Sequence, residues 1–117
     1  MDPMDTLTVG TPEEFGDWLE RNGRTKTEVW LVFFKQATGR TGLPYNRALE
    51  VALCYGWIDG KVRSLDAERY ARRFTARRPG SHWTEANRAI ARRLQAEGRL
   101  TAAGRAALPP DLEEELP

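Results

Sequence analysis

The most pronounced hydrophobic pattern in the chain is the run from Glu28 to Lys35 (EVWLVFFK), where β-branched and aromatic residues follow one another. This composition is typical of a β-strand. Side chains alternate between the two faces of a strand, and here both faces are apolar: Val29, Leu31, Phe33 on one and Trp30, Val32, Phe34 on the other. A strand that is apolar on both sides is covered on both sides, so we expect it in the middle of a sheet.

Four segments show helical patterns. The first starts at Thr11-Pro12-Glu13-Glu14, which combines a capping threonine, a proline at the first helical position and a capping-box glutamate. We expect this helix to end at Gly23 in a left-handed turn. A second helix is predicted over residues 44–55 and a third from Ser81 to about Glu97, and Thr101 caps a short fourth helix.

Two more strands are expected after the second helix. Gly56 to Gly60 predicts a tight turn, and residues 61–64 and 68–76 predict an antiparallel hairpin joined by a turn at residues 65–67. Taken with the first strand, the pattern predicts an α+β fold in which a small antiparallel sheet of about three strands packs with about four helices.

The length of the chain, 117 residues, is that of one domain. We expect a single domain over residues 1–117, with its core at about residues 7–108. The acidic tail, residues 109–117, has few apolar positions and is expected to be loosely held.

Cysteine and histidine are each present once, as Cys54 and His82. These counts exclude a disulfide within the chain and a zinc site built from several thiolates or imidazoles. We therefore expect no metal and no cofactor. Cys54 is flanked by Leu53 and Tyr55 and is expected to be a buried, inert thiol. His82 is expected to be exposed.

The sequence shows no sign of export or of a membrane span. Its first residues are acidic and poor in apolar side chains, unlike a signal peptide. The longest apolar run, Val29 to Phe34, has six residues, far fewer than the roughly 20 that cross a bilayer. The expected location is the cytoplasm.

Charge is distributed unevenly along the chain. Residues 61–99 contain eleven Lys or Arg and four Asp or Glu, a net charge of +7, although the whole chain carries only +1. Such a segment suggests either a solvated face or a surface for an anionic partner. Four arginines lie mostly off the buried stripe of the third helix and predict a basic outer surface: Arg88, Arg92, Arg93 and Arg99.

Two segments carry a family resemblance. Residues Ala52 to Gly60 (ALCYGWIDG) resemble the signature ALCFGWIDG of the YdeI/OmpD-associated family, also called the bacteriocin-protection family. Residues Tyr70 to Thr84 (YARRFTARRPGSHWT) resemble its second signature, Y-x-x-R-F-T-P-R-x-x-x-S-x-W-S, with Ala76 where proline is usual. Asn87 matches the asparagine that follows this signature.

The resemblance covers about residues 7–108. It implies a role in protection against bacteriocins and antimicrobial peptides. It implies no reaction, because no catalytic residue or cofactor is established across the family.

Polar residues inside these apolar segments are the first candidate site residues. By strand alternation Arg72 shares a face with Tyr70 and Phe74, so its charge must find a partner, and Asp59 is the obvious one. The pair is either structural, or Arg72 points into a cleft and awaits an anion. Asn87, on the predicted buried stripe of the third helix, either ties the loop before that helix or lines a pocket.

Arginines before the third helix are the second candidate. Arg77 and Arg78 precede the predicted helix start at Ser81, where free N–H groups and two guanidinium groups suit an anion. Trp83 offers either a stacking face or a core side chain. The expected ligand-binding residues are Trp57, Asp59, Tyr70, Arg72, Arg77, Arg78, Trp83 and Asn87.

Three functions remain open from the sequence. The favoured one is a non-enzymatic binding protein that engages an anionic small molecule or an acidic partner through an arginine-rich face. The same arginine-rich segment would suit nucleic-acid binding, but the sequence contains no known nucleic-acid recognition motif. An enzyme of unknown reaction would use Asp59, Arg72 and Asn87 in a pocket lined by Trp57, Tyr70 and Trp83.

Overall fold

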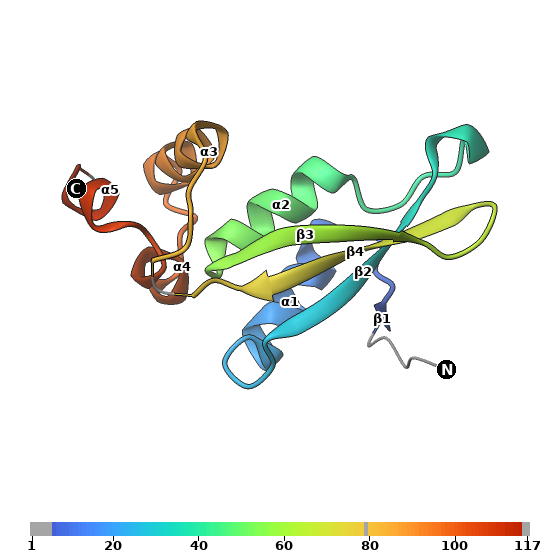
Figure 1. The fold of residues 1–117 in the computed structure, drawn as a ribbon, viewed down its shortest axis with the longest axis horizontal. Helices are drawn as coiled ribbons and strands as arrows, with labels where there is room; N and C mark the ends of the chain where they lie inside the picture. The colour runs from blue at the N-terminus through green and yellow to red at the C-terminus, as the bar shows by residue number, and fades with distance from the viewer. Residues whose placement is uncertain (1–5, 79, 116–117) are drawn as a thin grey trace.

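A computed structural model describes residues 6–78 and 80–115, which form an α+β fold (Figure 1). In chain order its elements are β1 (Thr6–Leu7), α1 (Pro12–Asn22), β2 (Glu28–Phe34), the 3-10 turn η1 (Gln36–Thr38), α2 (Tyr45–Cys54), β3 (Trp57–Ser64), β4 (Arg69–Ala76), α3 (Glu85–Ala96), α4 (Ala102–Ala106) and α5 (Pro110–Glu115).

The sheet has the strand order β1-β2-β4-β3. β2 pairs antiparallel with β4 along its whole length and parallel with the short β1, so the prediction that β2 is an interior strand is confirmed. β3 and β4 form the predicted hairpin. The sheet is mixed and has four strands, not about three, because β1 adds a two-residue parallel edge that periodicity cannot detect.

One face of the sheet packs against α1 and α2. Val29, Leu31 and Phe33 of β2 are buried there, and Phe74 of β4 meets Phe15 of α1 edge-on, with 5.5 Å between the ring centroids. Thr11 caps α1 as expected, because its hydroxyl accepts a hydrogen bond from the Glu14 N–H. We call this the inner face of the sheet.

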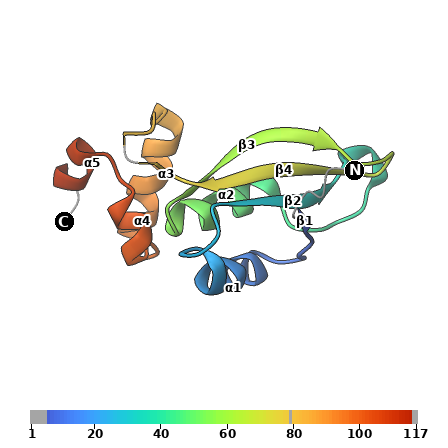
Figure 2. The ribbon, with the colours of Figure 1, turned by 60° about the horizontal axis from the view of Figure 1, so that its bottom comes forward.

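Figure 2 shows α1 and α2 on one side of the sheet. On the opposite, outer face, where a cover was also expected, arginine side chains lie over the aromatic rings of β2. The guanidinium carbon of Arg63 lies 5.5 Å from the Trp30 ring centroid, and that of Arg40 lies 4.5 Å from the Phe34 centroid. Arginine can cover an aromatic ring with its apolar stem and interact with the ring's π system.

A second hydrophobic cluster joins α2 to the C-terminal helices at one end of the sheet (Figure 1). Leu94 of α3 and Leu112 of α5 are fully buried in it. The expectation of a loosely held tail is therefore wrong for residues 110–115: they form α5, and Leu112 fixes α5 to the rest of the cluster. Only residues 116–117 of the tail lie outside the described residues.

Several predicted boundaries differ from the observed ones. Trp57 to Gly60 belongs to β3 and is not a tight turn, although a register shift follows Asp59. α3 begins at Glu85 with Thr84 as its cap, four residues later than predicted. Gly23 is right-handed, with φ of −64°, whereas Gly98 ends α3 with φ of 70°.

Candidate functional site

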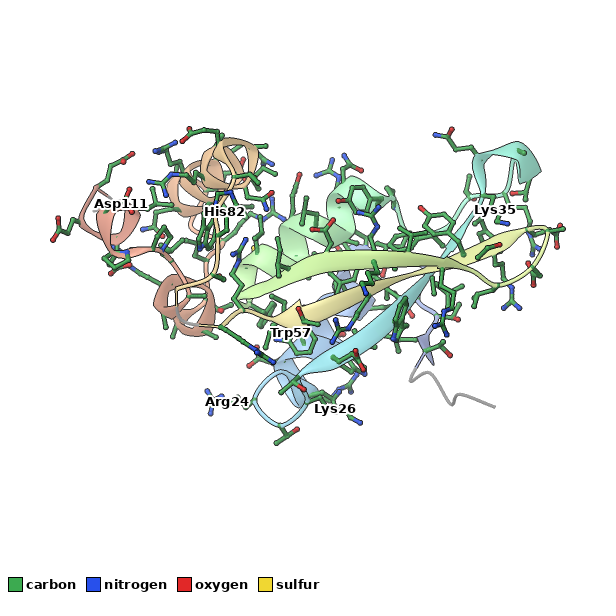
Figure 3. All side chains as sticks on the ribbon, viewed as in Figure 1. Arg24, Lys26, Lys35, Trp57, His82 and Asp111 are labelled. Atoms are coloured by element: carbon green, nitrogen blue, oxygen red, sulfur yellow. The ribbon has the colours of Figure 1, made fainter. Side chains whose placement is uncertain are left out.

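The expected site residues do not converge on one surface. Asp59 and Arg72 meet on the inner face of the β3–β4 hairpin. Arg77 and Trp83 meet in the segment that links β4 to α3. Trp57 belongs to neither group: it is 1% exposed and meets Trp18 edge-on at 5.8 Å, so the expectation that it contacts a ligand is wrong (Figure 3).

The first group is an ion pair with a tyrosine. Arg72 Nη1 donates to Asp59 Oδ2 at 2.7 Å, and the Tyr45 hydroxyl donates to the same oxygen. The Arg72 guanidinium also lies 4.5 Å from the Tyr45 ring centroid. The predicted pairing of Arg72 with Asp59 is confirmed. Its charges are mutually compensated, which favours a structural role for the pair.

Tyr45 carries the clearest titration shift of this group. Burial raises the pKa of Tyr45 to about 12, and the hydrogen bond to Asp59 acts in the same direction because an ionised phenol could not donate it. Tyr45 is therefore held as a neutral hydrogen-bond donor at neutral pH. It is unsuited to act as a base.

We expect Tyr45 to ionise near pH 12 when followed by NMR of its labelled phenol carbon. Asp59→Asn should lower this pKa, because it removes the negative charge beside the phenol. Tyr45→Phe assigns the resonance. Ionisation of Tyr45 near pH 10 in the unmodified protein would show that its phenol is neither buried nor hydrogen-bonded to Asp59 in solution.

Two other expected residues lie apart from this pair. Tyr70 stacks on Phe33, with 5.4 Å between the ring centroids, and is half-buried. Asn87 lies in the first turn of α3, where its backbone N–H donates to the Thr84 hydroxyl. The hydrogen bonds that hold the preceding loop come from Arg77, so the structure does not show Asn87 tying that loop.

The second group is built around Arg77. Its guanidinium stacks on Trp83, with 3.7 Å from Cζ to the ring centroid. Nη1 donates to Ser81 Oγ at 2.9 Å and to the His82 carbonyl at 3.3 Å, both neutral acceptors. Nε and Nη2 are buried without a hydrogen-bond partner among the described residues. Trp83 is 9% exposed, which agrees with the expected core side chain, and its ring face carries the Arg77 guanidinium, so a stacking face for a ligand stays a prediction.

Burial of this cation has an electrostatic consequence. It lowers the pKa of Arg77 to about 10, and the more distant charge of Asp59 compensates only in part. A lowered arginine pKa means that the protein disfavours the charged form relative to water. A bound anion would reverse this effect by supplying the missing negative charge.

A hollow of about 640 Å³ opens beside Arg77. Basic and hydroxyl side chains from β4 and the following segment line it, together with Thr27 and Ile58: Arg73, Thr75, Arg77, Arg78 and Ser81. We call this hollow the arginine pocket. Arg73 is paired with Glu28, whereas Arg78 is exposed. The pocket precedes α3 by several residues, so the expected contribution of that helix's N-terminus to an anion site is not supported.

Most other arginines of the basic segment are paired. Arg88 binds Asp111, and Arg92 Nε donates to Glu115 Oε1 at 2.6 Å. Arg93 and Arg99 both bind Glu50 and Glu97. The predicted basic outer surface is therefore wrong for these four arginines, because the acidic α5 neutralises two of them and Glu50 and Glu97 neutralise the other two.

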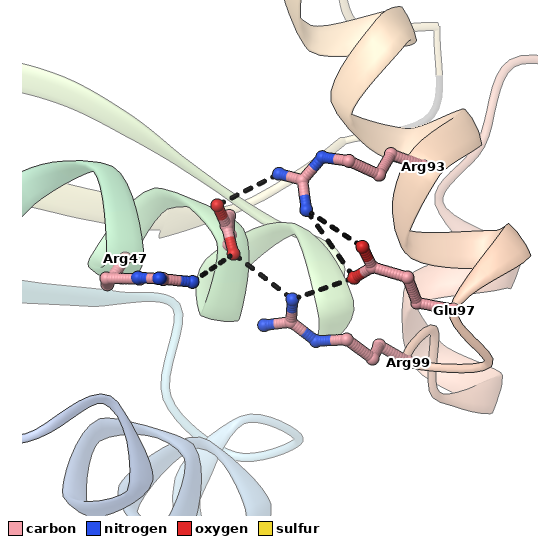
Figure 4. Close-up of polar contacts among 5 residues, drawn as sticks. Arg47, Arg93, Glu97 and Arg99 are labelled. Atoms are coloured by element: carbon pink, nitrogen blue, oxygen red, sulfur yellow. Dashed lines mark hydrogen bonds and ion pairs between the residues drawn. The ribbon is translucent and has the colours of Figure 1, made fainter.

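Glu50 pairs with three arginines, Arg47, Arg93 and Arg99, and it was not among the residues expected from the sequence. Figure 4 shows how these arginines surround one carboxylate. Glu50 is 8% exposed and accepts from Arg93 Nη2 at 2.9 Å and Arg99 Nη1 at 3.1 Å, with Arg47 Nη1 at 3.6 Å. The sequence signal was a lone glutamate between apolar residues of α2. Its partners, 43 and 49 residues away, could not be identified from spacing.

The single cysteine and histidine behave as expected. Cys54 is buried, and burial raises the pKa of its thiol. His82 is exposed beside the C-terminal helices (Figure 3). Among residues 6–78 and 80–115, no group of three or more His, Cys, Asp or Glu side chains could hold a metal ion. No helix within the described part of the chain is long and apolar enough to cross a membrane.

Comparison with known proteins places the chain in a family without giving it an activity. No curated protein and no solved structure matches it. Residues 7–107 match a family described as a domain of unknown function, DUF8412, and these residues run from the second residue of β1 to just past the end of α4. The match spans most of the chain, which therefore belongs to the DUF8412 family.

Proposed function

We propose that this chain is a non-enzymatic binding protein that holds an anionic ligand in the arginine pocket. The observation that carries the proposal is the state of Arg77. Its guanidinium is half-buried and stacked, its two hydrogen bonds go to neutral oxygens, and two of its nitrogens are buried with no hydrogen-bond partner in the part of the chain that the structure describes. Buried guanidinium groups ordinarily pair with an acid.

An anion in the pocket would satisfy this unmet requirement. Charge-assisted hydrogen bonds are each worth about 1.5–3 kcal/mol. Arg78 adds a second, exposed charge, and Ser81 and Thr75 add hydroxyl groups to the lining. The proposal does not rest on the net charge of residues 61–99. Arg77 and Arg78 line the pocket, whereas the arginines of α3 lie outside it and are paired with carboxylates.

The resemblance to the YdeI/OmpD-associated family supports the same location. Arg73, Arg77 and Ser81 stand at fixed positions of the second signature and line the pocket, and Trp83, also fixed, carries the stacked guanidinium. We extend the proposal to the role implied by that resemblance, protection against bacteriocins and antimicrobial peptides.

The two alternatives draw less support. Nucleic-acid binding relied on a basic surface, but Arg88, Arg92, Arg93 and Arg99 are paired with carboxylates. An enzyme would need its polar groups around one pocket. Asp59 and Arg72 instead pair with each other, and Asn87 lies on another element.

The test is isothermal titration with inorganic phosphate, sulfate and nucleotides at low salt. We expect Arg77→Gln to weaken binding at least tenfold, because it removes one charge-assisted interaction of about 1.5 kcal/mol or more. Arg92→Gln is the matched control and should leave binding unchanged, because Arg92 is paired with Glu115 away from the pocket.

Circular dichroism should show that both variants remain folded. The proposal fails if none of these anions binds the unmodified protein, or if the folded Arg77→Gln variant binds them as tightly.

A further inference from the structure

A second hollow, of about 270 Å³, lies on the other side of the segment that holds Arg77. Besides that segment, Trp83 and residues 106–110, at the end of α4 and the start of α5, line it. Leu108 and Trp83 are nearly fully buried there and belong to the second hydrophobic cluster. The ion pairs of α5 described above use none of the residues that line this hollow.

The two hollows share one wall. Arg77, Arg78, Gly80 and Ser81 line both of them. The residues outside this wall differ between the two hollows. In the arginine pocket they include the Arg73 guanidinium and the hydroxyl groups of Thr27 and Thr75, whereas in the second hollow they are Trp83 and residues 106–110, which carry no charged or hydroxyl group. Ligand pockets are commonly built this way, with an apolar lining for the body of the ligand and a few polar groups that fix its orientation.

We infer that the ligand is a small amphiphilic anion, whose charged group binds in the arginine pocket while an apolar body joined to it fills the hollow beside α4 and α5. This inference rests on the proposed function and adds the chemical class of the ligand. The shared wall supports it, because a ligand that spans the wall contacts Arg77 with its anionic group and the Trp83 side of the second hollow with its apolar part.

Titration calorimetry with a series of linear alkyl phosphates measures the contribution of the apolar part. The probes are inorganic phosphate and the ethyl, butyl and hexyl monoesters, each below its micelle concentration. Burying a methylene group contributes about 0.8 kcal/mol, so we expect affinity to rise about fourfold for each added methylene until the hollow is filled.

Ala106→Gln tests where the alkyl chain lies. Ala106 lines the second hollow and is exposed, so a longer polar side chain there should obstruct the hollow and leave the fold intact. We expect this variant to bind inorganic phosphate normally and to lose the dependence on chain length. Ala37→Gln is the matched control, since Ala37 is an exposed residue of η1 outside both hollows.

The possible outcomes separate the two proposals. Phosphate binding that depends on Arg77 but does not rise with chain length would overturn the amphiphile and leave the anion site standing. A chain-length dependence that survives in folded Ala106→Gln would overturn the placement beside α4. Absence of binding by every probe would overturn the proposed function and this inference together.

Discussion

Gly104→Ala should lower the free energy of unfolding by about 3 kcal/mol, because the new methyl group has no space. A Cβ at residue 104 would lie 2.2 Å from the Cys54 carbonyl oxygen and 3.0 Å from that of Leu53. Both are backbone atoms at the end of α2, so no side-chain rotation relieves the overlap. α4 must move away from α2, which strains the hydrogen bonds from Thr101 N and Oγ1 to the Cys54 carbonyl, at 3.0 and 2.6 Å.

Thermal and urea unfolding followed by circular dichroism measure this effect. A loss of about 3 kcal/mol corresponds to roughly 10 °C in Tm for a domain of this size. Gly10→Ala is the matched control, since its new Cβ would have only an ordinary 3.5 Å contact with Glu14, and it should unfold like the original protein. A Gly104→Ala protein with unchanged Tm would mean that α4 does not press against α2.

Glu50→Gln should lower the free energy of unfolding by about 2 kcal/mol near neutral pH. Glu50 is the shared acceptor of arginines on and after α3, so its carboxylate links α2 to the C-terminal helices. The amide of glutamine keeps the shape but removes the charge. The cost stays below that of a fully buried pair, because the arginine side chains are 45% and 37% exposed and water can solvate them.

The effect should depend on pH in a defined direction. Burial acts to raise the pKa of Glu50, but hydrogen bonds from Arg93 and Arg99 outweigh it and hold that pKa below its usual value. A carboxyl whose pKa is lowered on folding stabilises the protein above its unfolded pKa, and this stability is lost as the pH falls through the folded pKa. The difference between the two proteins should therefore shrink below about pH 4.

Urea unfolding at a series of pH values checks this dependence. Arg92→Gln again serves as control, because it breaks a solvent-exposed ion pair of α3 and should cost much less than Glu50→Gln. A pH-independent loss in Glu50→Gln would show that the carboxylate is not ionised in the fold. A loss no larger than that of the control would show that the Glu50 network does not fasten α3.

Local signals in the sequence predicted most of the elements. The cap at Thr11 located α1, and Thr101 located α4, because a capping hydroxyl acts on backbone N–H groups three residues away. The apolar character of both faces of β2 placed it correctly inside the sheet. At the start of β3, pairing with β4 overrode the turn preference of the flanking glycines, as tertiary pairing often does.

Contacts between residues that are far apart in the sequence could not be predicted from such local signals. The acidic composition of α5 suggested a solvated tail, but its charges are matched by Arg88 and Arg92, 23 residues earlier. The outer face of β2 was expected to be covered, but the sequence could not show that Arg63 and Arg40 are the residues that cover its aromatic rings.

The candidate site was predicted in part. Arg72 and Asp59 were correctly paired by strand alternation and the cost of an unpaired charge. Arg77 was chosen for its place before a helix, but its distinguishing feature is that it stacks on Trp83 and that its hydrogen bonds within the described residues go to neutral oxygens. Sequence patterns reveal which charges are present, while which of them remain uncompensated is decided by the fold.

The most direct test of the arginine pocket is an NMR titration that follows the arginine side-chain Nε–H groups while inorganic phosphate is added at low salt. The Arg77 signal should move progressively and saturate, while that of Arg92, already paired with Glu115, stays in place. An Arg77 signal that remains unmoved at saturating phosphate would contradict the pocket as an anion site.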